Sequence, residues 1–462
     1  MIVIVATDEG ERVELQDIPA RSVVTVTSAH AIEVDLLFIG PVDAASPARC
    51  ENKDLPLPRP STPSHFVGKI RDVSFNRRTF ISLGGRVALG LPLLSLGACS
   101  RRAVSATSDA GRWQSLIEYL EKELPSLLER DRTTPGVAMA LVADARLLWS
   151  RGFGVKDRMT NAPVDSDTVF EFASVSKTVF AYVVMKACEK GLLNLDTPLT
   201  KYTTDRLLDG DPRLDLITPR HVLSHTTGFQ NWRSKTDQLK IHFTPGAHWG
   251  YSGEGYWYLQ SVLTHLTGHV DTNDCKTEDD GLRVCATDFE TYMKANLLTP
   301  FGMTSSGYIY REGMARPHDE KGRMLADRKA TAIEAARYGS AGELHSSVNE
   351  YAKFLIEIID PRPADAFRLS ATSHLEMLRP QVKLTDILWW GLGWTIEQHP
   401  GMGNIITHSG DNPGFKTMTA ASVRRRSAFI IVTNGDRGFD NIIMPVLRSS
   451  PMREFLPVTI GI

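Results

Sequence analysis

Cysteine is scarce in this sequence and is not arranged for metal binding. Its five cysteines, among 462 residues, are Cys50, Cys99, Cys188, Cys275 and Cys285, and none lies in the paired CxxC spacing typical of a structural zinc site. We therefore expect no metal site. Cys275 and Cys285 flank the polar stretch KTEDDGLRV, where a disulfide would restrain a surface loop in an oxidising compartment; in a reducing one they would be two loop thiols.

The sequence also lacks an excess of charge of either sign. The formal net charge is −2, which provides no basic surface for nucleic acid, so a small or neutral substrate is the better expectation. The composition is 42% hydrophobic and 23% charged, as in a globular protein with a sizeable core. The sequence has no repeat of fixed period and no low-complexity tract, which argues against a solenoid and a disordered chain.

The longest apolar segment is too short and too interrupted to span a bilayer. Residues 76–100, NRRTFISLGGRVALGLPLLSLGACS, have an arginine pair and an apolar run broken by Gly85, Arg86 and Pro92. The segment resembles a twin-arginine export signal that ends in a lipoprotein cleavage box. Cys99 would then be lipidated and tether an exported, periplasmic or membrane-anchored protein. The alternative is a buried hydrophobic helix.

The position of this segment conflicts with an export role, because such signals work from the amino terminus. About 75 residues precede it and end in the proline-rich linker LPLPRPSTP. We hypothesise that translation begins nearer Val67 or Val73. If residues 1–66 are instead translated, the runs SVVTVTSA and IEVDLLFI indicate a few short strands. We divide the chain into a first segment, 1–75, within which the hypothesised later start lies, a signal, 76–100, and a main domain, 101–462.

The main domain has the periodicity of an α/β (α+β) fold. Residues 112–130 carry an apolar stripe of helical spacing, and 136–155 have the alternation of a β-hairpin. A mainly helical middle follows. The sequence then gives four strand-like runs and a last helix, at 391–398, 404–410, 415–423, 427–434 and 439–450. We expect a mixed, largely antiparallel sheet flanked by helices, with a helical lobe beside it and a site in the cleft between them.

The stretch EFASVSKTVF (171–180) places Ser174 three residues before Lys177. On a helix these two side chains share a face, so the lysine amine can approach the serine hydroxyl. A serine needs such a base to act as a nucleophile, and a lysine whose pKa is lowered by burial can supply it. Backbone N–H groups at the helix N-terminus could also bind an oxyanion. Alone, SxxK is weak, since chance gives on the order of one match per chain of this length.

Two further stretches strengthen the interpretation of Ser174 as a nucleophile. GYSGEGY (250–256) holds Tyr251 in a glycine-flanked turn before a helical run, a setting that can present a phenol at a cleft. THSGDNPGF (407–415) places His408 two residues before Gly410, where an edge strand could line the same cleft. Taken singly, the tyrosine could be a packing aromatic and the histidine a surface residue. Their order and spacing after Ser174 are what stand out.

These motifs resemble those of the serine β-lactamase and penicillin-binding-protein superfamily. The matching segments are Ser174 to Lys177, Tyr251 to Gly253 and His408 to Gly410, and the resemblance is closest to the branch of class C β-lactamases, D-alanyl-D-alanine carboxypeptidases and β-lactamase-like carboxylesterases. Companion stretches are LDTPLTKY, ITPRHVLSHTTGF, SAGELHSSVNEYAKF and GLGW. The resemblance covers roughly residues 112–445 and is specific for the superfamily, not for a substrate.

The resemblance implies a role for each catalytic motif residue. Ser174 is expected to be the acylated nucleophile, and Lys177 and Tyr251 are expected to share the proton transfers. Which of these two is the base in acylation is disputed for the related β-lactamases, and both assignments stay open here. No metal or organic cofactor is required for this chemistry.

The resemblance also implies how substrate is held. The oxyanion hole is expected to use the backbone N–H groups of Ser174 and of Asp411, which follows Gly410. His408 stands where penicillin-processing enzymes have a lysine, and this removes a permanent cation that would pair with a substrate carboxylate. Gly253 replaces an asparagine that holds a substrate amide. Both departures favour a neutral ester.

We therefore expect an exported serine hydrolase that acts on a small-molecule ester through an acyl-enzyme. Two alternatives are a D-amino-acid peptidase or β-lactamase with the same chemistry, and a catalytically idle penicillin-binding-like lipoprotein.

Three other features are expected to be structural. Glu254 is interpreted as a solvated turn residue, and His221 and His225 have a spacing compatible with zinc but no evident third ligand. Three tryptophans are expected in the core or cleft wall: Trp389, Trp390 and Trp394.

Overall fold

The computed structural model describes residues 2–3, 24–25, 109–203, 207–208, 210–234, 237–268, 278–325, 331–401 and 403–458. The chain divides into two units, Met1–Cys99 and Ser100–Ile462, and each is described by itself. In the first unit, β1 (Ile2–Val3) pairs in parallel with β2 (Val24–Thr25). The predicted signal at 76–100, with Cys99, lies outside the described residues. The hypotheses about lipidation and the translation start therefore stay predictions.

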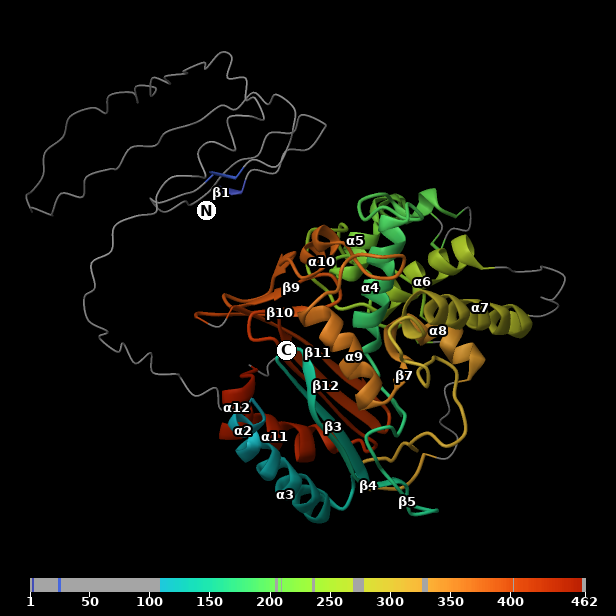
Figure 1. Ribbon diagram of the computed structural model, residues 1–462. Coiled ribbons are helices and arrows are strands. Elements are labelled where there is room, and N and C mark those ends of the chain that lie inside the picture. The colour runs from blue at the N-terminus through green and yellow to red at the C-terminus, as the bar shows by residue number, and fades with distance from the viewer. Residues whose placement is uncertain are drawn as a thin grey trace, which may run out of the picture. The chain divides into compact units, whose positions relative to one another are not determined.

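The second unit is built on a nine-stranded antiparallel sheet (Figure 1). The order across the sheet is β5-β4-β3-β13-β12-β11-β10-β9-β8. A separate pair, β6 with β7, lies outside it. The strands are β3 (Gly136–Ala143), β4 (Arg146–Asp157), β5 (Ala162–Pro163), β6 (Phe170–Glu171), β7 (His345–Ser346), β8 (Val382–Lys383), β9 (Leu388–Trp390), β10 (Thr395–His399), β11 (Gly403–Asn412), β12 (Phe415–Ser422) and β13 (Ser427–Thr433).

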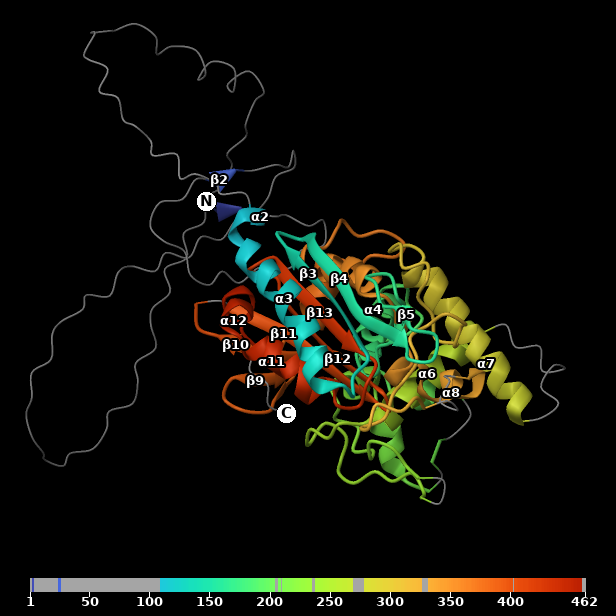
Figure 2. The same ribbon diagram turned by 90° about the horizontal axis from the view of Figure 1, so that it is seen from below.

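The sheet is covered on both faces because its central strands are apolar on both sides. Successive side chains of a strand point to opposite faces, and in β3 Val137, Met139 and Leu141 join one core while Ala138 and Ala140 join the other. Figures 1 and 2 show the sheet between two helical layers, one with α3, α11 and α12 and the other with α4 and α9. The predicted α/β fold with a largely antiparallel sheet is confirmed.

The helices of the second unit follow the predicted segments closely. The predicted helix at 112–130 is α3, whose buried leucines repeat at helical spacing. Further helices form the lobe beside the sheet. The helices are α2 (Asp109–Arg112), α3 (Gln114–Asp131), α4 (Ser176–Glu189), α5 (Pro219–Leu223), α6 (Gly253–Thr267), α7 (Glu278–Met293), α8 (Ala332–Gly342), α9 (Val348–Ile359), α10 (Ala371–Met377), α11 (Met444–Arg448) and α12 (Ser450–Phe455).

One predicted helix boundary and the predicted location of one cysteine need correction. The helix expected at 439–450 is a π-helical segment, Phe439–Ile443, followed by α11, and Ser449 then turns to extended backbone and caps α12. Pro451 explains the break, because a proline ring clashes with the preceding helical turn. Cys285 lies in α7 and not in a loop. Its proposed partner, Cys275, lies outside the described residues, so the disulfide stays a prediction.

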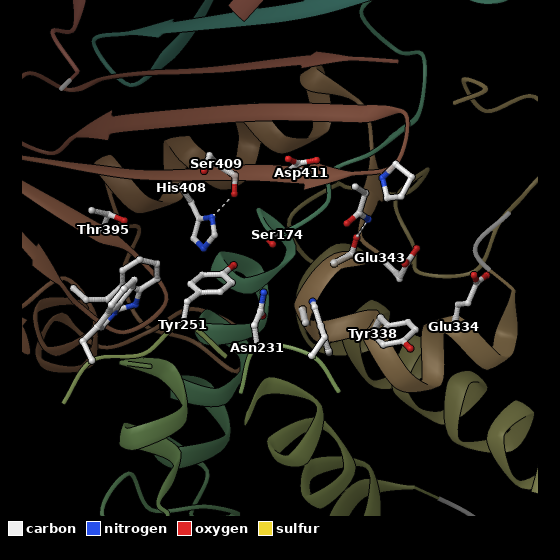
Figure 3. A pocket seen from close by; sticks show the side chains of 17 residues that line it. Ser174, Asn231, Tyr251, Glu334, Tyr338, Glu343, Thr395, His408, Ser409 and Asp411 are labelled. Atoms are coloured by element: carbon white, nitrogen blue, oxygen red, sulfur yellow. Dashed lines mark hydrogen bonds between the residues drawn. The ribbon is translucent and has the colours of Figure 1, made fainter. Parts of the chain in front are cut away.

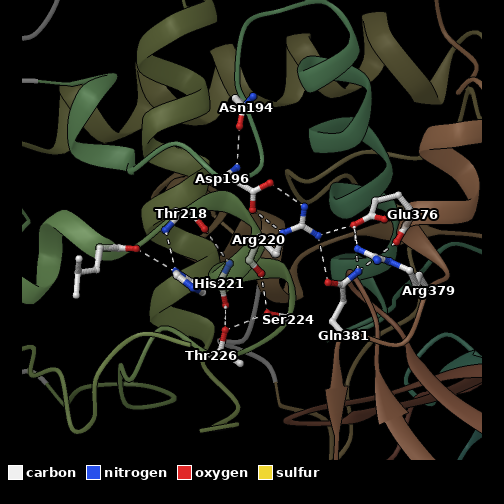
Figure 4. A network of polar contacts seen from close by, with 11 residues as sticks. Asn194, Asp196, Thr218, Arg220, His221, Ser224, Thr226, Glu376, Arg379 and Gln381 are labelled. Carbon is white, nitrogen blue, oxygen red and sulfur yellow. Dashed lines mark hydrogen bonds and ion pairs between the residues drawn. The ribbon is translucent and has the colours of Figure 1, made fainter. Parts of the chain in front are cut away.

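A polar network holds the lobe together around Arg220 of α5 (Figure 4). Its guanidinium binds both carboxylate oxygens of Asp196, at 2.6 and 2.9 Å, and Oε1 of Glu376 in α10 at 2.5 Å. Thr218 and His221 form a capping box at the start of the same helix. The network fixes α5, which leads directly into the turn at His225 beside the site. Within the part of the chain that the structure describes, no helix has the length and apolar character needed to cross a bilayer.

Candidate active site

Ser174 lies in a tight turn just before α4. Two backbone N–H groups, of Ser176 and Lys177, donate to the carbonyls three residues earlier, each at 3.0 Å. In such an i to i+3 turn, side chains three residues apart eclipse one another, so Lys177 comes directly over Ser174. Ala173 has φ of 49°, a left-handed conformation that is unfavourable for a residue with a Cβ and is common at functional sites.

Lys177 brings an amine to the serine from a buried position. Its Nζ lies 3.1 Å from Oγ of Ser174 and donates to the carbonyl of Ala341 at 2.6 Å. The side chain is 1% exposed. Burial disfavours the charged ammonium and lowers the pKa of Lys177 to about 7. Near neutral pH a large fraction of the amine is therefore uncharged and able to accept a proton.

Tyr251 lies at the other side of the serine, in the turn that precedes α6. Its hydroxyl hydrogen bonds with Ser174, and Nζ of Lys177 lies 4.8 Å from its ring centroid. Burial raises the pKa of Tyr251 above its usual value. The resting side chain is therefore a neutral phenol, which can pass a proton on but is a poor base in its own right.

His225 holds the tyrosine ring in place, a contact that we did not expect from the sequence. Its imidazole stacks on the Tyr251 ring, with centroids 4.2 Å apart, and its Nδ1 accepts a hydrogen bond from the N–H of Ser252 at 3.0 Å. Burial, followed by the charge of Lys177, lowers the pKa of His225 well below its usual value. A neutral ring there packs against the phenol without adding charge. The spacing with His221 is explained by this contact and by the cap of α5.

His408 is placed at the cleft by the end of strand pairing. Strand β10 pairs with β11 from Gly403 to Thr407, whereas β12 pairs with it as far as Asn412. The second half of β11 is thus the edge strand that we predicted. Nδ1 of His408 donates to the carbonyl of Ser409 at 2.7 Å, which leaves Nε2 as the acceptor nitrogen of the neutral ring. Burial, followed by the charge of Lys177, lowers the pKa of His408 to about 3.

Gly410 allows β11 to pass directly against the serine turn. A Cβ built on Gly410 would lie 2.6 Å from the carbonyl oxygen of Phe172 and 3.2 Å from the backbone nitrogen of Ser174. Only glycine fits so close a backbone approach. The next residue, Asp411, forms an ion pair with Lys416 at 2.9 Å, which ties this end of β11 to β12.

These side chains meet in one cleft of about 690 Å³ (Figure 3). The cleft contains the predicted residues Ser174, Tyr251, His408 and Asp411, and Lys177 touches the serine from beneath it. Among the described residues that line the cleft there is no lysine or arginine. The lining residues are Ser174, Asn231, Trp232, Trp249, Tyr251, Glu334, Tyr338, Ala341, Gly342, Glu343, Trp390, Thr395, His408, Ser409, Asp411, Asn412 and Pro413.

Glu254 is not the solvated turn residue that we expected. It is 4% exposed, accepts a hydrogen bond from the N–H of Arg233 at 3.0 Å and pairs with the Arg233 side chain at 3.3 Å. It anchors a cleft-wall loop to the first turn of α6. Of the three tryptophans, Trp390 lines the cleft and Trp394 is fully buried, as predicted.

A buried polar group that includes the cleft residue Glu343 has ligand types that a metal ion could use. Glu171, Glu343 and His345 bring their ligand atoms within 4.8 Å of one another. The first and last are register partners in β6 and β7, and Asn412 of β11 donates to the Glu171 carboxylate. We assign these residues a structural role in joining β6 and β7 to β11. This group could not be predicted from sequence patterns, because Glu171 lies far along the chain from Glu343 and His345.

A serine hydroxyl in contact with a lysine amine and a tyrosine phenol, at the wall of a cleft, defines a class of serine hydrolases. The chain belongs to the β-lactamase family, whose model matches residues 116–448. It is 25% identical over 344 residues to penicillin-binding protein 4* of Bacillus subtilis, covering 70% of this chain and 72% of that protein. It is 34% identical over 106 residues to esterase EstB of Burkholderia gladioli, covering 22% and 26%.

Solved structures show the same fold. The D-alanine carboxypeptidase AmpC of Burkholderia cenocepacia superposes with a TM-score of 0.58 and 19% identity, covering 72% of this chain and 97% of that one. A β-lactamase/D-alanine carboxypeptidase of Pseudomonas syringae gives 0.59 and 18%, covering 73% and 99%. At these identities the likeness establishes the fold and leaves the substrate to the chemistry of the site.

Proposed function

We propose that this chain is a carboxylesterase that hydrolyses neutral esters through an acyl-enzyme on Ser174. The observation that carries the proposal is the charge of the cleft. No cation lines it among the described residues, its acidic residues include Glu334 and Glu343, and the buried His408 is neutral above a pH of about 3. A substrate carboxylate, which β-lactams and D-alanyl peptides both carry, would find no partner there, whereas a neutral ester needs none.

The proton transfers follow from the resting contacts. Nζ of Lys177 contacts the Ala341 carbonyl at 2.6 Å and Oγ of Ser174 at 3.1 Å. In its neutral form the amine can keep one hydrogen on the carbonyl and has a lone pair that can accept the Ser174 proton. As Oγ forms a bond to the ester carbonyl carbon, its proton moves to Nζ. We assign the base in acylation to Lys177 and not to Tyr251, whose pKa is raised by burial.

The tetrahedral intermediate then collapses and the ester C–O bond breaks. The leaving alkoxide takes a proton that is relayed from Lys177 through the Tyr251 hydroxyl. In the resting enzyme this hydroxyl is hydrogen-bonded to Ser174. Water repeats the sequence on the acyl-enzyme and releases the acid. The carbonyl oxygen would be stabilised by the backbone N–H groups of Ser174 and Asp411, next to the close approach at Gly410.

The decisive test compares three substrates on one enzyme preparation. We expect kcat/KM for a p-nitrophenyl ester to exceed that for a D-Ala-D-Ala peptide and a chromogenic cephalosporin by on the order of 100-fold. Ser174→Ala should abolish all turnover. A faster peptide or cephalosporin would replace the ester assignment with peptidase or β-lactamase. Failure of a fluorophosphonate to label Ser174 in folded protein would favour a non-catalytic binding role.

We further propose that the protein is exported and tethered by lipid at Cys99. The proposal is supported by the arginine pair, the interrupted apolar run and the LGAC sequence at 76–100. Amino-terminal sequencing of the protein from its native host tests it. A mature chain that retains residue 1 contradicts it.

A further inference from the structure

Gly253 and Trp232 occupy one another's space at the N-terminus of α6. A Cβ built on Gly253 would lie 2.1 Å from Cζ2 and 2.3 Å from Cη2 of Trp232. No side chain fits at position 253 unless the indole moves. The missing side chain at the third position of the tyrosine motif therefore leaves no gap, because an aromatic ring fills its place.

The segment that carries the indole is anchored to the start of α6. Residues on both sides of Trp232 bind the start of α6: Oδ1 of Asn231 accepts from the N–H of Gly253 at 3.0 Å, and the N–H of Arg233 donates to the buried Glu254 at 3.0 Å. These contacts account for the burial of Glu254. The short segment 231–233 is thereby fixed before any substrate binds.

A second aromatic side chain completes the wall. The ring of Tyr338, on α8, meets the indole of Trp232 edge to face, with centroids 5.1 Å apart and an interplanar angle of 89°. Both residues line the cleft, and they remain 41% and 38% exposed. Large apolar side chains left open beside a nucleophile offer surface for an apolar group of the substrate.

The position of the proton donor shows which half of the ester this wall would hold. In Figure 3, Tyr251 and His408 lie on one side of Ser174, and Tyr338 and Glu334 lie on the other. The leaving oxygen must come within reach of the Tyr251 hydroxyl, so the alcohol half departs on that side. The acyl half then extends towards Trp232 and Tyr338.

We propose that Trp232 and Tyr338 form an acyl-binding subsite that selects esters of aromatic acids. The inference rests on the proposed esterase function and narrows it. An aromatic acyl group can stack on the indole, whereas an acetyl group has no ring and little apolar surface to place against it. Gly253 is part of this subsite, because the indole can occupy its position only when residue 253 has no side chain.

The test varies the acyl group while the leaving group stays constant. We expect wild type to prefer p-nitrophenyl phenylacetate over p-nitrophenyl acetate in kcat/KM by roughly tenfold. Trp232→Ala should reduce this ratio to about one, and Trp232→Phe should retain most of it. Gly253→Ala, whose methyl displaces the indole, should lower the ratio as well. The matched control is Leu375→Ala, 70% exposed on α10, which should keep the wild-type ratio.

The outcomes separate this inference from the function on which it rests. If wild type hydrolyses neither ester and Ser174 is not labelled, the esterase proposal fails. If both esters are hydrolysed at equal kcat/KM, or if the preference survives in Trp232→Ala, the subsite is wrong and the esterase stands. A Trp232→Ala effect that follows the alcohol in a series of acetate esters would reverse the assignment of the two halves. Should Trp232→Ala not fold, Tyr338→Ala is judged by the same ratio.

Discussion

Two basic residues, Lys177 of α4 and Arg220 of α5, have opposite surroundings. Lys177 is 1% exposed and its Nζ contacts a hydroxyl and a carbonyl, both uncharged. Arg220 is bound by the carboxylates of Asp196 and Glu376. Burial lowers the pKa of the lysine to about 7, whereas the hydrogen bonds that Arg220 donates to Asp196, and then to Glu376, raise the pKa of the arginine.

The difference separates a reactive cation from a structural one. A charge matched by carboxylates keeps its proton and fixes the elements that carry those carboxylates, as Arg220 does for α5 and α10. A buried amine without a counter-charge gives up its proton near neutral pH and becomes a base. We expect the same kind of substitution at the two positions to have opposite consequences, which the following experiments test.

The largest expected effect is on turnover when Lys177 loses its ability to accept a proton. Lys177→Met has no amine, and Lys177→Arg stays protonated at any working pH. Each should lower kcat/KM for p-nitrophenyl acetate by about 1,000-fold or more. The measurement is steady-state hydrolysis with folding checked by circular dichroism. An arginine variant with a tenth of wild-type activity would move the role of base to another group.

The pH profile should report the lysine directly. Because the amine must be neutral to act, kcat/KM should rise about tenfold per pH unit below a pH of about 7 and level off above it. His408, with a pKa of about 3, should not contribute in this range. His408→Asn serves as the check: its activity can differ, but its inflection should stay near 7. Loss of that inflection in the variant would assign the titration to the histidine.

The reactive centre could largely be predicted from the sequence, because each of its residues lies in a short motif with a local structural cause. The turn at Ser174, the helix start after Tyr251 and the strand edge at His408 are each formed within a few residues. The predicted contact between Ser174 and Lys177 is present, and the backbone that makes it is a tight i to i+3 turn leading into α4.

The cleft wall could not be predicted, because it depends on loop closure. Trp232 reaches the start of α6, 21 residues later, because Asn231 binds Gly253 and Arg233 binds Glu254, and no pattern in the sequence marks these pairs. His225 was set aside for a similar reason: its stacking on Tyr251 follows from the fold of the whole lobe. Burial and aromatic contact are long-range properties, whereas motif spacing is local.

The paired cation should matter for stability. Arg220→Met keeps the apolar stem but leaves the carboxylates of Asp196 and Glu376 without their shared partner. Because the arginine side chain is 24% exposed and Arg379 still binds Glu376, we expect a loss of about 2 kcal/mol and not the full cost of a buried pair. The urea midpoint measures it. Arg379→Met, 60% exposed, is the control and should change stability by less than about 0.5 kcal/mol.

Replacing Lys177, which has no carboxylate partner among the described residues, should raise the stability of the fold, whereas replacing Arg220 should lower it. The pKa of Lys177 is about 7 in the folded chain and ordinarily 10.5, because burial disfavours the charged amine, so folding is opposed at pH values below about 10.5. Lys177→Met removes this opposition but also the bond to Ala341, and we expect a gain of about 1 kcal/mol at pH 7. The gain should shrink as the pH rises towards 10, because the unfolded lysine then loses its proton too. Thermal unfolding at pH 7 and 9.5 tests this. If Lys177→Met is less stable than wild type at pH 7, the buried lysine does not lower the free energy of unfolding. Lys177 and Arg220 would then not differ in the way proposed here.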